Sequence, residues 1–119
     1  MSMITDPSLE DDLSEVLDRA AETFAILGSP VRLRILQAIC DGERSVSEIV
    51  SLTRQSQTNV SQHLALMFRG GLLARRRSGA QHFYSVADPD VVAVCRVVCT
   101  RIAADGIHAR RGGQRRGEA

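Results

Sequence analysis

The strongest constraint on the fold is a short predicted helix, a polar turn and a longer predicted helix in the middle of the chain. Ser45-Val46-Ser47-Glu48 has the form of a capping box, which predicts the start of a short helix running to about Leu52. After a polar turn at Arg54, residues 56–69 have the apolar spacing of a second amphipathic helix. Its predicted inward positions are Val60, Leu64 and Met67. This order predicts a helix-turn-helix.

A β-hairpin is predicted directly after the second of these helices. The stretch LLARRRSGAQHFYSV contains two short extended runs joined at Ser78-Gly79, with three arginines on the approach. A helix-turn-helix followed by a two-stranded hairpin is the arrangement of a winged helix-turn-helix. In that fold, short polar side chains on the second helix reach base edges, and cations on the hairpin reach the flanking backbone of DNA.

Three further helices complete the predicted fold. Apolar residues at helical spacing, followed by a glycine, predict a first helix over residues 9–27. Ser29-Pro30, an N-cap followed by proline, predicts a second helix that ends near Gly42. Asp88-Pro89 has the same form and predicts a last helix over residues 89–104. The predicted fold class is therefore mostly α with a small β-hairpin, in the order α-α-α-α-β-β-α.

One domain is predicted, over residues 9–104. With 119 residues, 44% of them hydrophobic, the chain can bury one small core, which dimerisation would help to stabilise. Residues 1–8 and the Gly- and Arg-rich tail over residues 105–119 are predicted to be disordered, because they carry few apolar side chains to bury.

The charges are divided unevenly along the chain. Up to Glu43 there are nine acidic residues and three arginines, whereas from Arg44 onward there are twelve arginines and five acidic residues. Every basic residue other than histidine is arginine, whose planar fork suits bidentate contacts with phosphate and guanine. The second half of the chain is therefore expected to bind a polyanion.

The cysteines are expected to be reduced thiols. No apolar run reaches the length of a membrane span, and the N-terminus lacks the layout of a secretion signal, so we expect a cytoplasmic protein. Three cysteines in such a chain argue against a disulfide framework.

The two runs ILGSPVRLRILQAICDGERSVSEIV and QTNVSQHLALMFRGGLLARRRSGAQHFYSVADPDV resemble the ArsR/SmtB family of small winged-helix repressors. The resemblance covers about residues 24–102. It implies a homodimer built from the first and last helices. It also implies binding to a near-palindromic operator that overlaps the protein's own promoter, and release from this DNA when an inducer binds.

The resemblance also implies which residues meet DNA. On the recognition helix they are Gln57, Thr58, Asn59, Ser61, Gln62 and His63, and on the wing they are Arg75, Arg76, Arg77 and Gln81. Two alternatives remain at this point: the polar helix face is a solvated surface only, and His63 is a structural cap. The arginines of the tail are either a further non-specific DNA contact or a solvated chain end.

The chain departs from the family at its two familiar metal sites. The stretch RSVSEI lacks the Cys-x-Cys motif that some members carry early in the third helix. Asp88 and Asp90 stand at the start of the last helix, but Arg101 and Ala104 occupy the later positions where ligands would be needed. The remaining candidates are Cys40, Cys95 and Cys99.

Two of these cysteines lie four residues apart in the predicted last helix. There they share a face with apolar neighbours, where free cysteine commonly acts as a small hydrophobe. Their predicted Cβ separation of roughly 5–6 Å is too long for a direct disulfide. A thiophilic ion could bridge it instead. The predicted face consists of Val91, Val94, Cys95, Val98, Cys99 and Ile102.

Cys40 lies late in the second helix, which is expected to pack against the last helix near Cys95 or Cys99. No cofactor is required by this pattern, and three interpretations stay open. The thiolates form a trigonal pocket for a soft metal or metalloid such as arsenite, mercury, cadmium or lead. Alternatively, Cys40 and Cys99 form a disulfide or polysulfide bridge with a reactive sulfur species. In the third interpretation, the cysteines only pack.

An enzyme is not expected. His82 is predicted on the wing and His108 in the tail, away from the cysteines, so no nucleophile and base pair is indicated. A winged helix used only for protein contacts is the remaining alternative, and it predicts no salt-dependent affinity for DNA.

Overall fold

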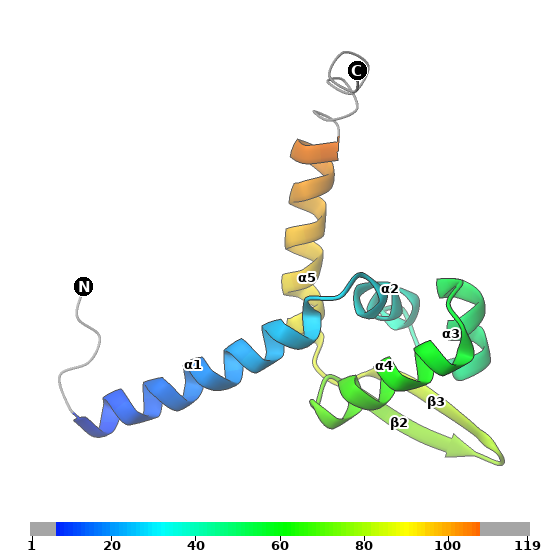
Figure 1. Ribbon diagram of the computed structural model, residues 1–119, viewed down its shortest axis with the longest axis horizontal. Coiled ribbons are helices and arrows are strands. Elements are labelled where there is room, and N and C mark those ends of the chain that lie inside the picture. The colour runs from blue at the N-terminus through cyan, green and yellow to red at the C-terminus, as the bar shows by residue number, and fades with distance from the viewer. Residues whose placement is uncertain (1–6, 108–119) are drawn as a thin grey trace.

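The structure, a computed structural model, describes residues 7–107 (Figure 1). Its elements are α1 (Pro7–Leu27), α2 (Pro30–Ile39), β1 (Arg44–Ser45), α3 (Val46–Thr53), α4 (Gln57–Arg69), β2 (Leu73–Ser78), β3 (Gln81–Val86), α5 (Pro89–Arg101) and a short π-helical segment η1 (Ile102–Ile107). The predicted fold class is confirmed, with β1 as an added strand. No helix among the described residues is long and apolar enough to cross a membrane.

Side-chain caps start the helices where the sequence predicts them. The Ser29 hydroxyl accepts a hydrogen bond from the Arg32 amide at 3.3 Å, and a proline follows the cap. Ser45 and Glu48 form the complete capping box of α3. These caps satisfy N–H groups that the first turn of a helix leaves without a partner. Ser56 and Asp88 cap α4 and α5 in the same way.

The core lies where α2, α3 and α4 meet. The six largest fully buried side chains are Ile35, Ile39, Ile49, Val60, Leu64 and Met67. Burying an aliphatic side chain of this size stabilises the fold by about 1.5–3 kcal/mol, so these contacts hold the three helices together. The three predicted inward positions of α4 are among them, as expected.

The sheet has three antiparallel strands in the order β1-β3-β2. Gly79 turns the hairpin with φ +64, a conformation that favours glycine, so the predicted turn is confirmed. β1 is only two residues long and pairs Ser45 with Phe83. Sequence patterns cannot indicate a strand of this length, particularly where one of its residues also caps a helix.

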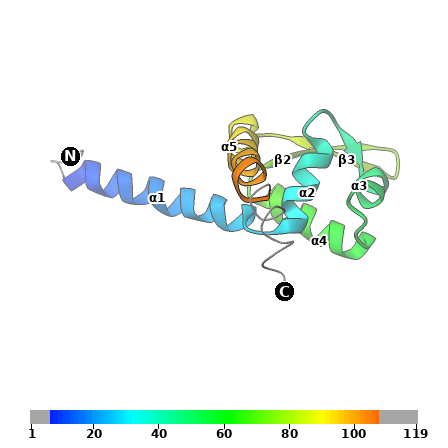
Figure 2. The same ribbon diagram turned by 90° about the horizontal axis from the view of Figure 1, so that it is seen from above.

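α1 and α5 leave the body in different directions (Figure 1), and Figure 2 shows α1 projecting as an arm. At the end of α1, the Ile26 side chain occupies the position that a Cβ at Gly70 would need. The C-terminal ends of α1 and α4 are therefore in close contact. Both projecting helices, together with the start of η1, leave large apolar side chains exposed, namely Leu9, Val16, Leu17, Phe24, Val94, Val97, Val98 and Ile102.

The ends of the described chain are more helical than the sequence predicts. α1 begins at Pro7, because proline suits the first helical position, rather than at residue 9. At the other end, η1 continues the helix beyond Asp105, where the tail was expected to be disordered. Arg101 lies 3.8 Å from Asp105 across one turn of this segment. Residues 1–6 and 108–119, including His108 and the arginines of the tail, lie outside the described residues.

Candidate nucleic-acid interface and cysteine groove

The outward face of α4 is polar and exposed. Gln57, Thr58, Ser61 and Gln62 are all exposed, opposite the buried face that holds the helix on the core. Asn59 differs, because it is half-buried and its amide donates a hydrogen bond to the Gln55 side chain at 2.9 Å. The exposed residues form a surface of short donors and acceptors at the N-terminal end of α4, which is the chemistry that reads base edges.

His63 lies at the flank of this face and is tied to the rest of the fold. Its Nδ1 is 3.1 Å from Nη1 of Arg32 in α2. Arg32 also donates hydrogen bonds to the carbonyl oxygens of Ile26 and, at 3.5 Å, of Ala25. A guanidinium only donates, so Nδ1 accepts and the proton of the neutral ring is on Nε2. His63 therefore links the recognition helix to the end of α1.

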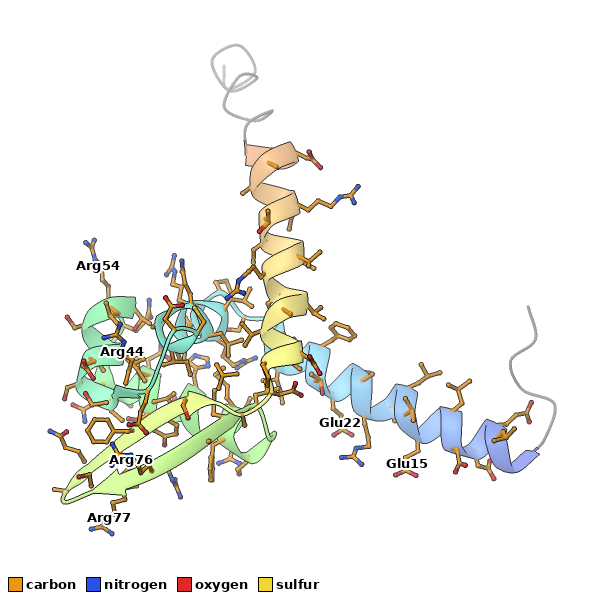
Figure 3. The ribbon with its side chains drawn as sticks, turned by 180° about the vertical axis from the view of Figure 1, so that it is seen from behind. Glu15, Glu22, Arg44, Arg54, Arg76 and Arg77 are labelled. Carbon is orange, nitrogen blue, oxygen red and sulfur yellow. The ribbon has the colours of Figure 1, made fainter. Side chains whose placement is uncertain are left out.

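The wing arginines differ in their surroundings. The Arg75 guanidinium lies over the Phe68 ring of α4, 4.3 Å from its centroid. Arg77 donates a hydrogen bond to the Gly79 carbonyl at 3.0 Å, and Figure 3 shows its side chain pointing away from the hairpin. Gln81 is exposed at the start of β3.

Arg76 is engaged with the body of the protein. Its guanidinium donates two hydrogen bonds to the carboxylate of Glu43, at 2.7 and 3.0 Å. The Arg76 side chain holds the pKa of the Glu43 carboxyl below its usual range, mainly through these hydrogen bonds, and Glu43 raises the pKa of Arg76 in return. The two remaining wing arginines are therefore better placed than Arg76 to meet DNA.

Three arginines that were not predicted from the sequence line one hollow that reaches the turn before α4. Arg34, Arg44 and Arg54 line a polar hollow of about 700 Å³ together with Gln55. Figure 3 shows Arg54 pointing outward from the end of α3, where its backbone has φ 58. An arginine in the turn between the two helices of the helix-turn-helix was a visible signal, because such a position can meet the DNA backbone.

The three cysteines line one groove between α2 and α5. The groove has a volume of about 290 Å³ and is mainly apolar. Cys40 is the C-cap residue of α2, and Cys95 and Cys99 come from α5. Arg34 and Arg96 also line this groove.

The three thiols have different environments. The Cys40 thiol donates a hydrogen bond to the Gln37 carbonyl at 3.2 Å, so it is turned back toward its own helix. Cys95 is half-buried, and its burial raises the pKa of the thiol, with a smaller contribution from the charge of Cys99. Cys99 is exposed.

The predicted trigonal pocket of three thiolates is not assembled. Within residues 7–107, no three His, Cys, Asp or Glu side chains lie close enough together to hold a metal ion. The predicted apolar face of α5 is also divided. Val91 and Cys95 pack on the core, whereas Val94, Val98 and Ile102 are exposed, because only one side of this helical segment faces the core. The groove therefore brings the three cysteines to one part of the fold without arranging them as a set of three metal ligands.

Known proteins that are similar to this chain are bacterial transcription regulators. Residues 29–74 match the model of the arsR family of bacterial regulatory proteins. The chain is 38% identical over 91 residues to the uncharacterized HTH-type transcriptional regulator Rv0081 of Mycobacterium tuberculosis, with 73% of this chain and 80% of the relative covered. It is 37% identical over 102 residues to a probable mercury resistance operon repressor of Streptomyces lividans, with 75% and 82% covered. The solution structure of the homodimeric winged helix-turn-helix DNA-binding domain Mb0332 of Mycobacterium bovis is similar at a TM-score of 0.71, with 29% identity and 91% and 95% of the two chains covered.

Proposed function

Because this chain belongs to the arsR family of bacterial regulatory proteins, we propose that it is a homodimeric repressor that leaves its operator when an inducer engages its cysteines. The family and the transcriptional role predicted from the sequence are confirmed, and the chain is a regulator rather than an enzyme.

Dimerisation is supported by the two projecting helices. α1 and α5 each expose a series of large apolar side chains, such as Phe24 and Val97, which are 61% and 68% exposed. Exposed apolar surface on this scale marks an interaction site. Mb0332, which is similar over most of this chain, is a homodimer. The apolar faces of α1 and α5 are the surfaces that a second copy covers.

Operator binding is supported by the outward face of α4 and by the wing. In a two-fold dimer the two α4 helices enter successive major grooves, and the two wings reach the flanking backbone. Gln57, Thr58, Ser61 and Gln62 supply donors and acceptors for bases, while Arg77 supplies a cation for phosphate. Arg54 extends the cationic surface to the start of α4.

One observation supports an inducer site above all: Cys40, Cys95 and Cys99 line a single groove between α2 and α5. These two helices contact different parts of the protein. α2 packs against α3 and α4, whereas α5 exposes part of the apolar surface available for dimerisation. An inducer that joins the two helices changes how the recognition helices sit relative to the dimer axis. Operator affinity then falls, which is the coupling that induction requires.

The inducer that fits best is a soft metal ion held by two thiolates. Thiolates select soft cations, and mercury(II) is satisfied by two sulfur ligands on opposite sides. The probable mercury resistance repressor, which shares 37% identity with this chain, supports this choice. Cys40 from α2 and either cysteine from α5 would hold the ion.

A disulfide between Cys40 and Cys99 is the second candidate, because both thiols line the groove and Cys99 is exposed to reagents. An organic persulfide would take two electrons and two protons from the thiols. It would leave as a thiol and hydrogen sulfide while the protein keeps the new sulfur–sulfur bond. With a second persulfide, one sulfane sulfur is kept: two persulfides and the two thiols give a trisulfide bridge, two thiols and one hydrogen sulfide.

The test is fluorescence anisotropy of the reduced protein on a labelled duplex of its own upstream DNA, without oxygen. We expect binding that weakens steeply with salt, and release by a stoichiometric mercuric salt. Arsenite and an organic persulfide are titrated in parallel, and each titration is repeated with Cys40→Ser, Cys95→Ser and Cys99→Ser.

The outcomes separate the candidates. Release by mercury(II) that Cys40→Ser abolishes supports the two-helix metal site. Release by persulfide alone supports the disulfide switch. Wild-type protein that no reagent releases has cysteines that only pack, and protein without salt-dependent DNA binding is an interaction module instead.

A further inference from the structure

The ion pair between Glu43 and Arg76 joins the wing to the body of the protein. We propose that this pair is a clamp that positions the wing, so that Glu43, an acidic residue, strengthens DNA binding. The inference rests on the proposed binding of operator DNA. It assigns Arg76 and Glu43 as positioning residues rather than DNA contacts.

The geometry of the pair is that of a fixed fork. Nη2 and Nε of Arg76 lie 2.7 and 3.0 Å from the two carboxylate oxygens of Glu43, so each oxygen receives one hydrogen bond. Such bidentate contacts have a defined orientation, unlike those of a single point charge. The guanidinium also lies 4.7 Å from the centroid of the Phe83 ring. Glu43 therefore contacts the edge of the planar Arg76 guanidinium, and the Phe83 ring lies against its face.

The clamp reaches across the whole sheet. β3 is the central strand, with β1 on one side and β2 on the other. Arg76 of β2 is the cross-strand partner of Phe83, and Phe83 is also the partner of Ser45 in β1. Residues that oppose each other in an antiparallel pair share a face, so Arg76 and Phe83 lie on the same face of the sheet. Glu43, just before β1, closes the contact from the far edge.

The wing needs such a contact because little else in the sheet restrains it. β1 pairs with β3 over two residues only, and the hairpin extends beyond this pairing to its turn at Gly79. A two-stranded hairpin alone is marginally stable in water. Arg75 on Phe68 braces one face of the hairpin, and the Glu43–Arg76 clamp braces the other.

Removal of Glu43 should change DNA affinity in the direction opposite to the one that charge repulsion alone predicts. An acidic side chain near the DNA-binding surface repels phosphates, so its removal ordinarily strengthens DNA binding. If Glu43 positions the wing, its removal weakens binding instead. Asp41 is the matched control, because it is an exposed acid in the same short segment between α2 and β1.

The experiment compares Glu43→Ala, Asp41→Ala, Arg76→Lys and the double variant Glu43→Ala/Arg76→Lys as full-length proteins. Arg76→Lys keeps the positive charge but removes the fork. Affinity for the upstream duplex is measured by anisotropy over a range of salt. Backbone ¹H–¹⁵N heteronuclear NOE values for residues 77–82 report the order of the wing without DNA, and thermal unfolding shows that each variant is folded.

We expect Glu43→Ala and Arg76→Lys each to weaken DNA binding about two- to fivefold, the range of a single exposed ion pair. The double variant should be no weaker than either single one. The salt slope should stay unchanged, and the NOE values at the hairpin tip should fall. Asp41→Ala should bind as tightly as wild type or more tightly.

Glu43→Ala that binds as tightly as Asp41→Ala, with unchanged NOE values, would overturn the clamp. So would a reduced salt slope in Arg76→Lys without any effect of Glu43→Ala, because Arg76 would then be a phosphate contact. If the wild type shows no DNA binding, the proposed function fails, yet the NOE comparison still decides whether the pair orders the wing.

Discussion

Nη1 of Arg32 lies 3.1 Å from Nδ1 of His63, and this contact joins α2 to the recognition helix α4. The same guanidinium donates hydrogen bonds to the carbonyl oxygens of Ala25 and Ile26 at the end of α1. One side chain therefore connects the arm, the core and the recognition helix. The alternative that His63 has a structural role is supported by this contact, because its Nδ1 is already in use.

Arg32→Met should lower the free energy of unfolding by about 1–3 kcal/mol, because two backbone carbonyls and His63 lose a charged donor. Arg34→Met on the same helix is the control, since Arg34 is exposed. Urea unfolding followed by circular dichroism gives both values. Equal losses in the two variants would mean that the Arg32 contacts contribute nothing to stability.

The capping box of α3 is the second test of local structure. Ser45 accepts a hydrogen bond from the Glu48 amide at 3.2 Å, and its own amide donates to the Glu48 carboxylate at 2.9 Å. Ser45→Ala should cost about 1 kcal/mol of stability, the usual value for a lost N-cap. Ser47→Ala, two residues on and exposed, should cost less. Chemical denaturation midpoints compare them, and a smaller effect at Ser45 would contradict the cap.

Helix starts could be predicted from the sequence because a cap depends on only a few neighbouring residues. The starts of α2, α3, α4 and α5 each carry a Ser or Asp cap, and these four helices begin close to where the sequence predicts them. The apolar spacing of α4 predicts its buried face for the same reason. Local chemistry determines where helices begin and which side faces the core.

Pairings between distant residues could not be predicted. Arg76 and Glu43 are 33 positions apart, and nothing in RRR distinguishes the arginine that pairs from the two that do not. The face of α5 was predicted as one stripe, but Cys95 faces the groove whereas Val98 is exposed. Which side of an amphipathic helix meets its own chain depends on tertiary packing that periodicity does not contain.

Arg77 provides a test of the wing as a DNA contact. Arg77→Gln should weaken binding to the upstream duplex and lower the slope of log K against log salt by about 0.9, the value for one lost phosphate contact. Arg101→Gln on α5 is the matched control, because it removes the same charge from a different part of the molecule (Figure 1). Anisotropy at several salt concentrations gives both slopes, and equal slopes in the two variants would exclude a specific wing contact.

The Cys95 thiol should lose its proton at a higher pH than an exposed thiol does. Burial raises its pKa, so at neutral pH a smaller fraction is thiolate, and the alkylation rate should rise only at higher pH. The measurement uses Cys40→Ser/Cys99→Ser protein, which retains Cys95 alone, with iodoacetamide over a pH series. The same protein in urea is the reference. Limited access of the reagent lowers the alkylation rate at every pH, whereas a raised pKa moves the midpoint of the pH profile. Identical midpoints for the folded protein and the protein in urea would contradict the effect of burial.

A connection between α2 and α5 through the cysteine groove should release the protein from DNA. Dibromobimane, which bridges two nearby thiols and fluoresces only when both have reacted, can make that connection without any metal or oxidant. Monobromobimane modifies the same thiols singly and is the control. We predict that bridged protein, verified by intact mass and peptide mapping between Cys40 and Cys95 or Cys99, loses operator affinity in anisotropy, while singly modified protein still binds. Bridged protein that binds the operator as tightly as the reduced protein would contradict the account.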